Sequence, residues 1–231
     1  MTGETDGAAA DGSGTPEAIM EATYRALCRR GFADLTMQDI ADESDKSKAS
    51  LHYHYDTKED LLFAFLDHLY DSFTEEFAAT DGDDAVDRLV TFVDELLCES
   101  DIEGSREFQT ALLEIKAQGP YVEAYRTELK RVDAFIRQRV EAIVTDGIEA
   151  GTVRADVDPH DTAAFVATLV DGVNTRRVAL GETDGSARNT FLAYVRENLV
   201  APDADVAVDL DPDGSTDAAG DARATATGGD D

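Results

Sequence analysis

The sequence predicts an all-α fold of about nine helices, in which a small N-terminal three-helix unit precedes a larger helical bundle. Two observations support this prediction. Apolar residues recur three or four positions apart in successive segments, which is the period of an amphipathic helix. Glycine, proline and aspartate breaks separate these segments at positions 31, 81–84, 119–120, 151 and 181.

The helices are expected, in chain order, at about residues 15–31, 37–43, 46–54, 57–79, 85–97, 106–118, 121–149, 158–180 and 186–199. In the first helix, Thr15 is a suitable N-cap and Pro16 suits the first turn, where its missing N–H costs nothing. Gly31 is expected to end the helix. Arg29 and Arg30 in its last turn suit the helix dipole, with phosphate contact as the alternative.

Residues 36–58, TMQDIADESDKSKASLHYHYDTK, predict two short helices around a polar turn. Thr36 and Asp39 have the spacing of a capping box, in which each side chain bonds the other residue's backbone N–H. Ser44 and Asp45 are expected to form the turn, because both side chains can bond nearby backbone groups. The stretch therefore has the pattern of a helix-turn-helix.

The second of these helices is expected to have one apolar and one polar face. Leu51 and Tyr55 lie one turn apart and can pack on Ile40. The opposite face carries a cation, a small residue and a hydrogen-bonding aromatic residue, namely Lys46, Ala49 and Tyr53, with Ser50 and His52 on its flanks. Such a surface suits the DNA major groove, where lysines neutralise phosphates and a small residue allows close approach. A short amphipathic helix with a solvated face is the alternative.

The same stretch resembles the N-terminal DNA-binding domain of the TetR/AcrR family of transcriptional regulators. The resemblance runs over about residues 15–73 and rests on Ile19, Ala22, Leu27, Gly31, Phe32, Thr36, Ile40, Ala41, Ser47, Lys48, Leu51, His52, His54, Tyr55, Thr57, Lys58, Glu59 and Leu61. Three residues depart from the family pattern. His52 stands where Tyr is usual, Asp45 where the turn Gly is usual, and Lys46 where a small apolar residue is common.

The resemblance implies a ligand-responsive transcriptional regulator, expected to be a repressor, that binds a near-palindromic double-stranded DNA operator as a homodimer. The residues expected to contact phosphates are Thr36, Ser47, Lys48, Tyr53, His54 and Lys58. The residues expected to face or flank the bases are Lys46, Ala49, Ser50 and His52. The acidic composition and the three departures leave an alternative, a helical small-molecule sensor or protein-partner module without DNA binding.

Residues 147–173, GIEAGTVRADVDPHDTAAFVATLVDGV, resemble more loosely the C-terminal half of TetR-type regulators. Within them, Asp158 is expected to cap a helix that begins with Pro159. The resemblance implies that the last two helices form a four-helix interface with a second protomer. The expected interface residues are Val166, Val170, Val173, Phe191 and Tyr194, and small Gly172 would allow close approach. Packing within one chain is the alternative.

A pocket for an unidentified small-molecule inducer is expected between the helix that starts after residue 57 and the helices of residues 84–180. Its expected apolar walls are Leu66, Tyr70, Phe92, Phe108, Leu112, Tyr125 and Phe165, with Asn174 and Arg176 as polar anchors. Plain core or interface packing is the alternative for each of these residues.

The net charge of −30 and the pI near 4.2 ordinarily argue against a nucleic-acid partner. Three of the five lysines nevertheless lie within residues 46–58. The acidic excess elsewhere is typical of a halophilic protein, since molar salt shortens the screening length to about 3 Å. A merely acidic protein of a mesophile is the alternative. The acidity is therefore interpreted as a solubility trait that does not define the partner.

Both ends of the chain are expected to be disordered, residues 1–14 as a small polar arm and residues 201–231 as an acidic tail with nine Asp and one Arg. Between them, a DNA-binding domain is expected at 15–60 and an effector-binding and dimerisation domain at 61–200. The sequence shows no targeting signal and no apolar run near the ~18 residues of a membrane helix. A cytoplasmic protein without a membrane partner is therefore expected.

Neither an enzyme, a cofactor nor a metal site is expected. No Gly-rich phosphate loop follows a strand and no nucleophile motif is present. His52 and His54 would project about 200° apart on a helix, which is poor geometry for one metal ion. Cys28 and Cys98 have no metal-ligand spacing and are expected to be reduced core residues.

Overall fold

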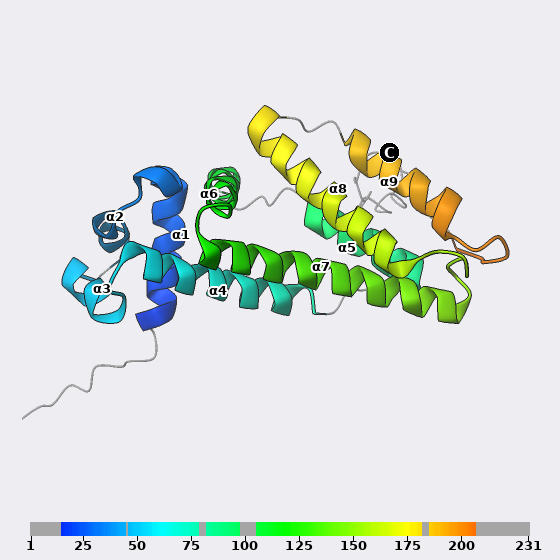
Figure 1. Cartoon of the computed structure of the whole chain (residues 1–231), viewed down its shortest axis with the longest axis horizontal. Helices are drawn as coiled ribbons and strands as arrows, with labels where there is room; N and C mark the ends of the chain where they lie inside the picture. Colours follow the sequence, from blue (N-terminus) through cyan, green and yellow to red (C-terminus); the bar gives the residue numbers. More distant parts are fainter. Residues whose placement is uncertain (1–14, 45, 79–81, 98–104, 182–184, 207–231) are drawn as a thin grey trace, which may run out of the picture.

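The computed structural model describes residues 15–44, 46–78, 82–97, 105–181 and 185–206 (Figure 1). These residues form nine α-helices and a short π-helical turn, η1, which confirms the predicted all-α fold. The helices are α1 (Thr15–Asp34), α2 (Met37–Asp42), α3 (Lys48–His54), α4 (Lys58–Glu76), α5 (Ala85–Leu97), α6 (Ser105–Gln118), α7 (Glu123–Ala150), α8 (Pro159–Leu180), α9 (Ser186–Tyr194) and η1 (Val195–Leu199). The predicted N-terminal arm, the turn residue Asp45, Cys98 and the tail from residue 207 lie outside the described residues.

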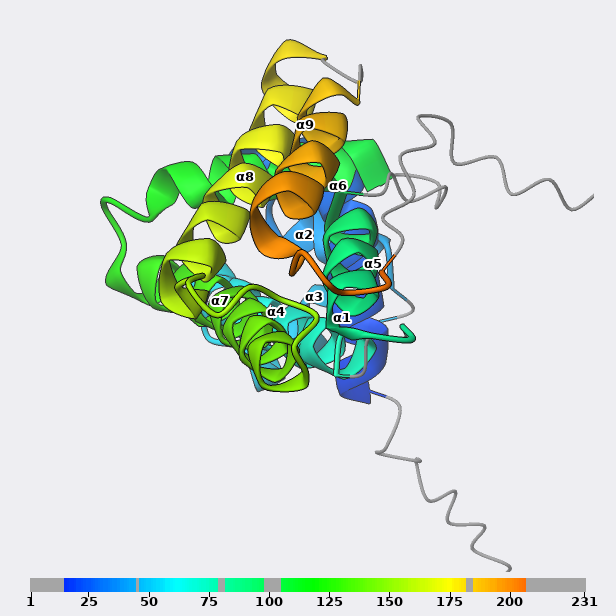
Figure 2. The ribbon, with the colours of Figure 1, turned by 90° about the vertical axis from the view of Figure 1, so that its right-hand side faces the viewer.

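The molecule is elongated, with α2 and α3 at one end and α8 and α9 at the other (Figure 1). α4 and α7 run side by side along the long axis, and Arg131 of α7 joins them. Its guanidinium donates to Asp67 of α4 at 2.6 Å and lies 4.0 Å from the centre of the Tyr70 ring. Figure 2, viewed along this axis, shows α8 and α9 packed over α5 and the distal half of α7. No described helix is both long and apolar enough to cross a membrane.

Two apolar cores lie along this axis. The C-terminal core is built by α5, α7, α8, α9 and η1 around fully buried residues such as Phe92, Val140 and Val166. The other core lies beneath α1–α3, a unit that we call the head. The head core is completed by residues of three further helices: Leu61, Leu62, Phe65 and Leu66 of α4, Ala111 and Ile115 of α6, and Tyr125 of α7. The boundary predicted at residue 60 therefore passes through a continuous core.

Gly31 kinks α1 where the helix was predicted to end. Its φ of 71° and ψ of 175° interrupt the helix, which runs on to Asp34. A residue with a side chain is strained at such a φ, so glycine suits this position. The next residue, Phe32, donates its backbone N–H to the Glu114 carboxylate of α6 at 2.6 Å. The kink in the head is thus held by a charge-assisted hydrogen bond from the bundle.

The chain remains ordered past the end that the sequence predicts for the bundle. Val200 N–H reaches back five residues to the Val195 carbonyl at 3.1 Å, which closes the π-helical turn. Ala201 N–H then donates to the Thr152 carbonyl at 2.9 Å, beside an isolated antiparallel bridge. Val206 packs against the C-terminal core. Ala201 and Val206, which the sequence predicts to lie in the disordered tail, therefore contact the folded chain.

Candidate DNA-binding site

Hydroxyl side chains begin both helices of the helix-turn-helix. Thr36 Oγ1 accepts from Asp39 N–H at 3.2 Å and Asp39 Oδ2 accepts from Thr36 N–H at 3.0 Å, which confirms the predicted capping box. The hydrogen bonds from Thr36, together with the Arg30 guanidinium 3.1 Å away, hold the pKa of the Asp39 carboxyl below its usual value. Ser47 Oγ caps α3 by accepting from Ser50 N–H at 3.2 Å.

The inner side of α3 packs as the sequence predicts. Leu51 is fully buried in the head core together with Ile40 of α2. Tyr55, which follows the helix, is half-buried against the same core, and its burial raises the pKa of its hydroxyl. This anchoring fixes which side of α3 faces outward.

The outward side of α3 is accessible and carries no carboxylate. Tyr53 is 86% exposed, and its ring meets that of His54 edge to face at a centroid distance of 5.2 Å. Ser47, Lys48, Ala49 and His52 are exposed beside them, whereas Lys46 and Ser50 are half-buried. Residues 46–55 contain two lysines, two histidines and no Asp or Glu. In a chain of net charge −30, this is a locally cationic surface.

Two of the predicted phosphate contacts already donate hydrogen bonds within the chain. Lys58 Nζ donates to the Leu35 carbonyl at 3.1 Å and lies 5.4 Å from the centre of the Phe32 ring. Thr36 Oγ1 donates to Asp39 Oδ2 at 2.5 Å. Both residues stabilise the start of α2 and the end of α1, so any contact with phosphate requires these bonds to be shared or broken.

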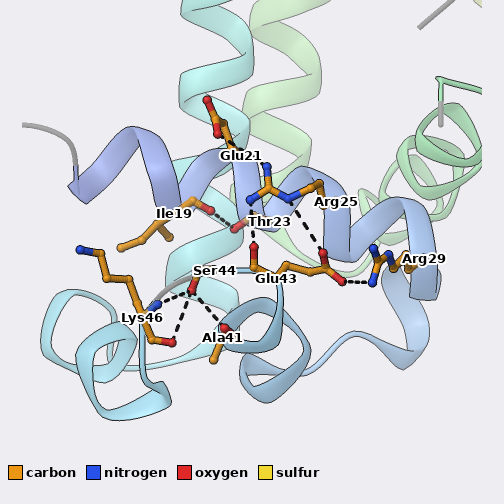
Figure 3. A network of polar contacts seen from close by, with 9 residues as sticks. All are labelled: Ile19, Glu21, Thr23, Arg25, Arg29, Ala41, Glu43, Ser44 and Lys46. Carbon is orange, nitrogen blue, oxygen red and sulfur yellow. Dashed lines mark hydrogen bonds and ion pairs between the residues drawn. The ribbon is translucent and has the colours of Figure 1, made fainter. Parts of the chain in front are cut away.

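Arginines of α1 hold the far end of α2 and the turn that follows it (Figure 3). Arg25 Nη2 donates to the Glu43 carbonyl at 2.9 Å, and Arg29 Nη1 lies 2.7 Å from Glu43 Oε1. Arg29 and Arg30 thus engage carboxylates of α2 and its cap, where the sequence suggested the dipole of their own helix. The last turn of α1 contains no basic residue, because the helix continues beyond Gly31.

The predicted pocket residues divide between the two cores. Those in or against the head core are Leu66, Phe108, Leu112 and Tyr125, whereas Phe92 lies in the C-terminal core. Tyr125 is only 2% exposed, and its hydroxyl has no hydrogen-bond partner among the described residues. Burial, with a smaller contribution from Glu59, raises the pKa of Tyr125 to about 12. A depression of about 510 Å³ lies elsewhere, between α1 and α2, and charged residues line most of it.

The remaining residues predicted for the pocket lie in four different local environments. Phe165 is 41% exposed and packs on the Tyr194 ring at 4.9 Å, so it faces away from the interior. Asn174 Nδ2 donates to the Leu96 carbonyl at 3.3 Å, while Arg176 is exposed. Tyr70 is covered by the Arg131 guanidinium described above. The structure therefore does not bring the predicted set together around one centre.

Three of the five residues predicted for the dimer interface are buried in the core of the monomer. Val166, Val170 and Phe191 are buried in the C-terminal core, because α8 turns this side toward α5 and α7. Val173 and Tyr194 are partly buried at its edge. A Cβ added at Gly172 would meet nothing within 4 Å, so this position is open. An interface on this face would use Phe165, Val173 and Tyr194 in place of the buried valines.

Among the described residues, no three His, Cys, Asp or Glu side chains come close enough together to hold a metal ion. The chemistry available at the exposed face of α3 is hydrogen bonding, stacking and charge neutralisation.

Comparison with known proteins agrees with this architecture. Residues 19–65 match the family model for bacterial regulatory proteins of the tetR family. Residues 85–201, just over half of the chain, match that for the C-terminal domain of BetI-type transcriptional repressors. The chain therefore belongs to the TetR family of transcriptional regulators.

Individual relatives show how far the similarity extends. A TetR transcription regulator from Haloarcula marismortui is 40% identical, with a TM-score of 0.74 over 81% of this chain and 99% of that one. The HTH-type regulator TtgR of Pseudomonas putida is 34% identical over 71 residues, so the match spans only 34% of the length of that curated relative. The repressor KstR2 of Rhodococcus jostii is 24% identical over 82% of this chain and 93% of its own length.

A protein from Saccharomonospora viridis, solved in complex with choline, has a TM-score of 0.66 at 24% identity. The match covers 81% of this chain and 98% of that one. This likeness concerns the fold.

Proposed function

We propose that this chain is a transcriptional repressor that binds a near-palindromic DNA operator as a homodimer and responds to a small-molecule effector. The main support for this proposal is the exposed face of α3. Tyr53 is 86% exposed and its ring contacts that of His54, Lys48 is exposed near the start of the same helix, and Leu51 anchors the buried side. A helix that is anchored on one side and carries cations, a small residue and hydrogen-bonding aromatic side chains outward matches what a major groove requires.

The two lysines supply the charge that the rest of the chain lacks. Each phosphate that a lysine neutralises releases counterions, and this release drives much of the affinity for DNA. In a homodimer, two copies of α3 would enter successive major grooves about 34 Å apart. Ser47, Lys48, Tyr53 and His54 are the proposed phosphate contacts. Ala49, Ser50 and His52 are proposed to face the bases, with Lys46 at their edge.

Two alanine substitutions test this proposal. A labelled duplex is first selected from a random library by the wild-type protein, and fluorescence anisotropy then gives the dissociation constants of variants. Tyr53→Ala and Lys48→Ala are each expected to weaken binding by about 1 to 3 kcal/mol, because each removes a contact to DNA. Unchanged affinity of both variants would contradict the proposal.

The chain offers a matched control for each substitution. Tyr121 is 84% exposed in the turn before α7, and Lys130 is exposed on α7. Tyr121→Ala and Lys130→Ala remove the same chemical groups outside the helix-turn-helix, so their affinities are expected to equal that of the wild type. Equal losses in test and control variants would point to a general effect on folding or charge.

The same assay examines the salt and effector components of the proposal. The acidic composition and the similarity to the Haloarcula protein favour binding that persists in molar KCl, so loss of binding below physiological salt would refute this component.

Added small-molecule effectors should change the dissociation constant for DNA. Choline is the first compound to test, because a protein of the same fold was crystallised with it.

A further inference from the structure

Two arginines of α1 converge on the residue that ends α2. Arg25 and Arg29 lie one helical turn apart, and both guanidinium groups face Glu43, the C-cap of α2. Arg29 Nη1 lies 2.7 Å from Glu43 Oε1, while Arg25 Nε lies 3.9 Å from Oε2 (Figure 3). The Glu43 side chain is only 12% exposed, which is low for a surface carboxylate. Shielding of this carboxylate from water strengthens its attraction to the guanidinium groups, although both arginines stay partly exposed.

The backbone of Glu43 is held from the same side. The last carbonyls of a helix have no partner within it, and they carry the negative end of its dipole. Arg25 Nη2 donates to the Glu43 carbonyl at 2.9 Å and so caps α2 with a positive charge from another helix. Arg25 thus donates a hydrogen bond to the backbone of Glu43 and forms a longer ion pair with its carboxylate, while its remaining guanidinium nitrogen lies 3.6 Å from Glu21 Oε2.

We call the contacts of Arg25 and Arg29 with Glu43 the clamp. The next residue, Ser44, links this clamp to α3 through two hydrogen bonds. Ser44 follows Glu43, and its Oγ donates to the Ala41 carbonyl at 3.1 Å. The same oxygen accepts from Lys46 N–H at 3.1 Å. Lys46 directly precedes Ser47, the N-cap of α3. The start of α3 is therefore linked to Arg25 of α1 through Glu43, Ser44 and Lys46.

We propose that Arg25 and Glu43 are positioning residues for DNA recognition, which hold the turn and hence the orientation of α3 without touching DNA themselves. This inference rests on the proposed function of α3. It is distinct from a phosphate-contact role for Arg25, whose side chain is 46% exposed. The two roles predict opposite signs for one substitution, Glu43→Gln.

Removing the Glu43 charge separates the two roles. If Arg25 served as a phosphate contact, Glu43→Gln would remove one of the two carboxylates beside it and a negative charge near DNA, so binding would tighten. If the pair positions α3, Glu43→Gln weakens binding by about tenfold despite the favourable change in charge. Asp42→Asn is the control, because Asp42 is an exposed acid of α2 whose carboxylate accepts from Gln38 of its own helix at 2.7 Å. Removing the negative charge of Asp42 is expected to leave the affinity for DNA unchanged or slightly higher.

Arg25→Gln provides the reciprocal measurement on the full-length protein and the same wild-type-selected duplex. We expect about tenfold weaker binding with an unchanged slope of log affinity against log salt, whereas loss of a phosphate contact lowers the slope by about 1. Lys48→Ala supplies the reference for such a lower slope. Glu43→Gln binding as tightly as the wild type, or Arg25→Gln reproducing the lower slope, would overturn the inference.

Hydrogen exchange tests the same clamp in the absence of DNA. Arg25→Gln and Glu43→Gln should each speed amide exchange in residues 46–55 by about tenfold. Exchange in residues 136–144 of α7 should stay at the wild-type rate, which separates the expected local effect from global destabilisation. Unchanged exchange at 46–55 in both variants would refute the positioning role. If the wild-type protein selects no duplex, the proposed function fails, and the exchange result then shows only whether Arg25 and Glu43 hold α3 in place.

Discussion

Gly147, in the last turn of α7, is predicted to be a position where a single added methyl group destabilises the bundle. A Cβ built there would lie 2.5 Å from Val153 Cγ2 and 2.9 Å from Ala85 Cβ, well inside van der Waals contact. Neither neighbour can move aside easily. Val153 and Thr152 both donate their N–H groups to the Gly147 carbonyl at 3.0 Å, and Ala85 begins α5 in the C-terminal core.

The expected magnitude of Gly147→Ala combines two opposing effects. Overpacking a fixed core costs about 1 to 3 kcal/mol, and the pinned backbone places this site at the upper end. Alanine is favoured over glycine within a helix by about 1 kcal/mol. The free energy of unfolding should therefore fall by about 2 kcal/mol. Urea denaturation followed by circular dichroism at 222 nm, at fixed KCl concentration, measures this difference.

Gly172→Ala in α8 is the matched control. A Cβ there meets nothing within 4 Å of the same chain, so only the helix-propensity gain of up to about 1 kcal/mol should remain. Gly147→Ala being as stable as the wild type would refute the packing argument. The control also reports on the dimer when measured at two protein concentrations. A loss of stability that grows on dilution would place Gly172 against a second protomer.

Two further predictions concern the junction of the head with α6 and α7. Glu114→Ala leaves the Phe32 N–H without its acceptor at 2.6 Å and should lower the free energy of unfolding by about 1 to 3 kcal/mol, while Glu114→Gln recovers part of the loss; equal urea midpoints for wild type and Glu114→Ala would contradict this. Burial raises the pKa of Tyr125 to about 12, so the folded protein keeps this hydroxyl neutral after the unfolded chain has begun to ionise it near pH 10. The contribution of Tyr125 to stability is thus present below pH 10 and is lost as the pH rises towards 12. Tyr125→Phe should lose less stability than the wild type across this window in urea titrations, and parallel losses would show that the hydroxyl does not titrate as inferred.

Local chemistry made much of the fold and the site predictable. The capping box of Thr36 and Asp39, the N-cap Asp158 with Pro159, and the left-handed Gly151 and Gly181 behave as the sequence predicts. These features depend on groups within four residues of one another, so the sequence contains all the interacting partners. Anchoring of α3 by Leu51 was predictable for the same reason, since helical periodicity and one apolar neighbour define the buried side.

Long-range packing decided the rest. Lys58 was expected to contact a DNA phosphate but donates to the Leu35 carbonyl. Arg29 and Arg30 form ion pairs with carboxylates of α2 and its cap. A charged side chain of this length reaches any partner within several ångströms, and the choice depends on how helices distant in sequence are placed. The clamp of Arg25 on Glu43 could not be inferred from spacing for this reason.

The sequence by itself determined the order and approximate positions of the helices, that an acidic chain carries a cationic stretch at 46–55, and the family to which that pattern belongs. Only the tertiary structure decided which sides of α8 and α9 are buried in the monomer core, and that α4, α6 and α7 complete the core of the head. The physical reason is the range of the interactions. Caps and periodicity act over one or two turns of chain, whereas burial of an apolar face depends on whichever surface the folded chain brings against it.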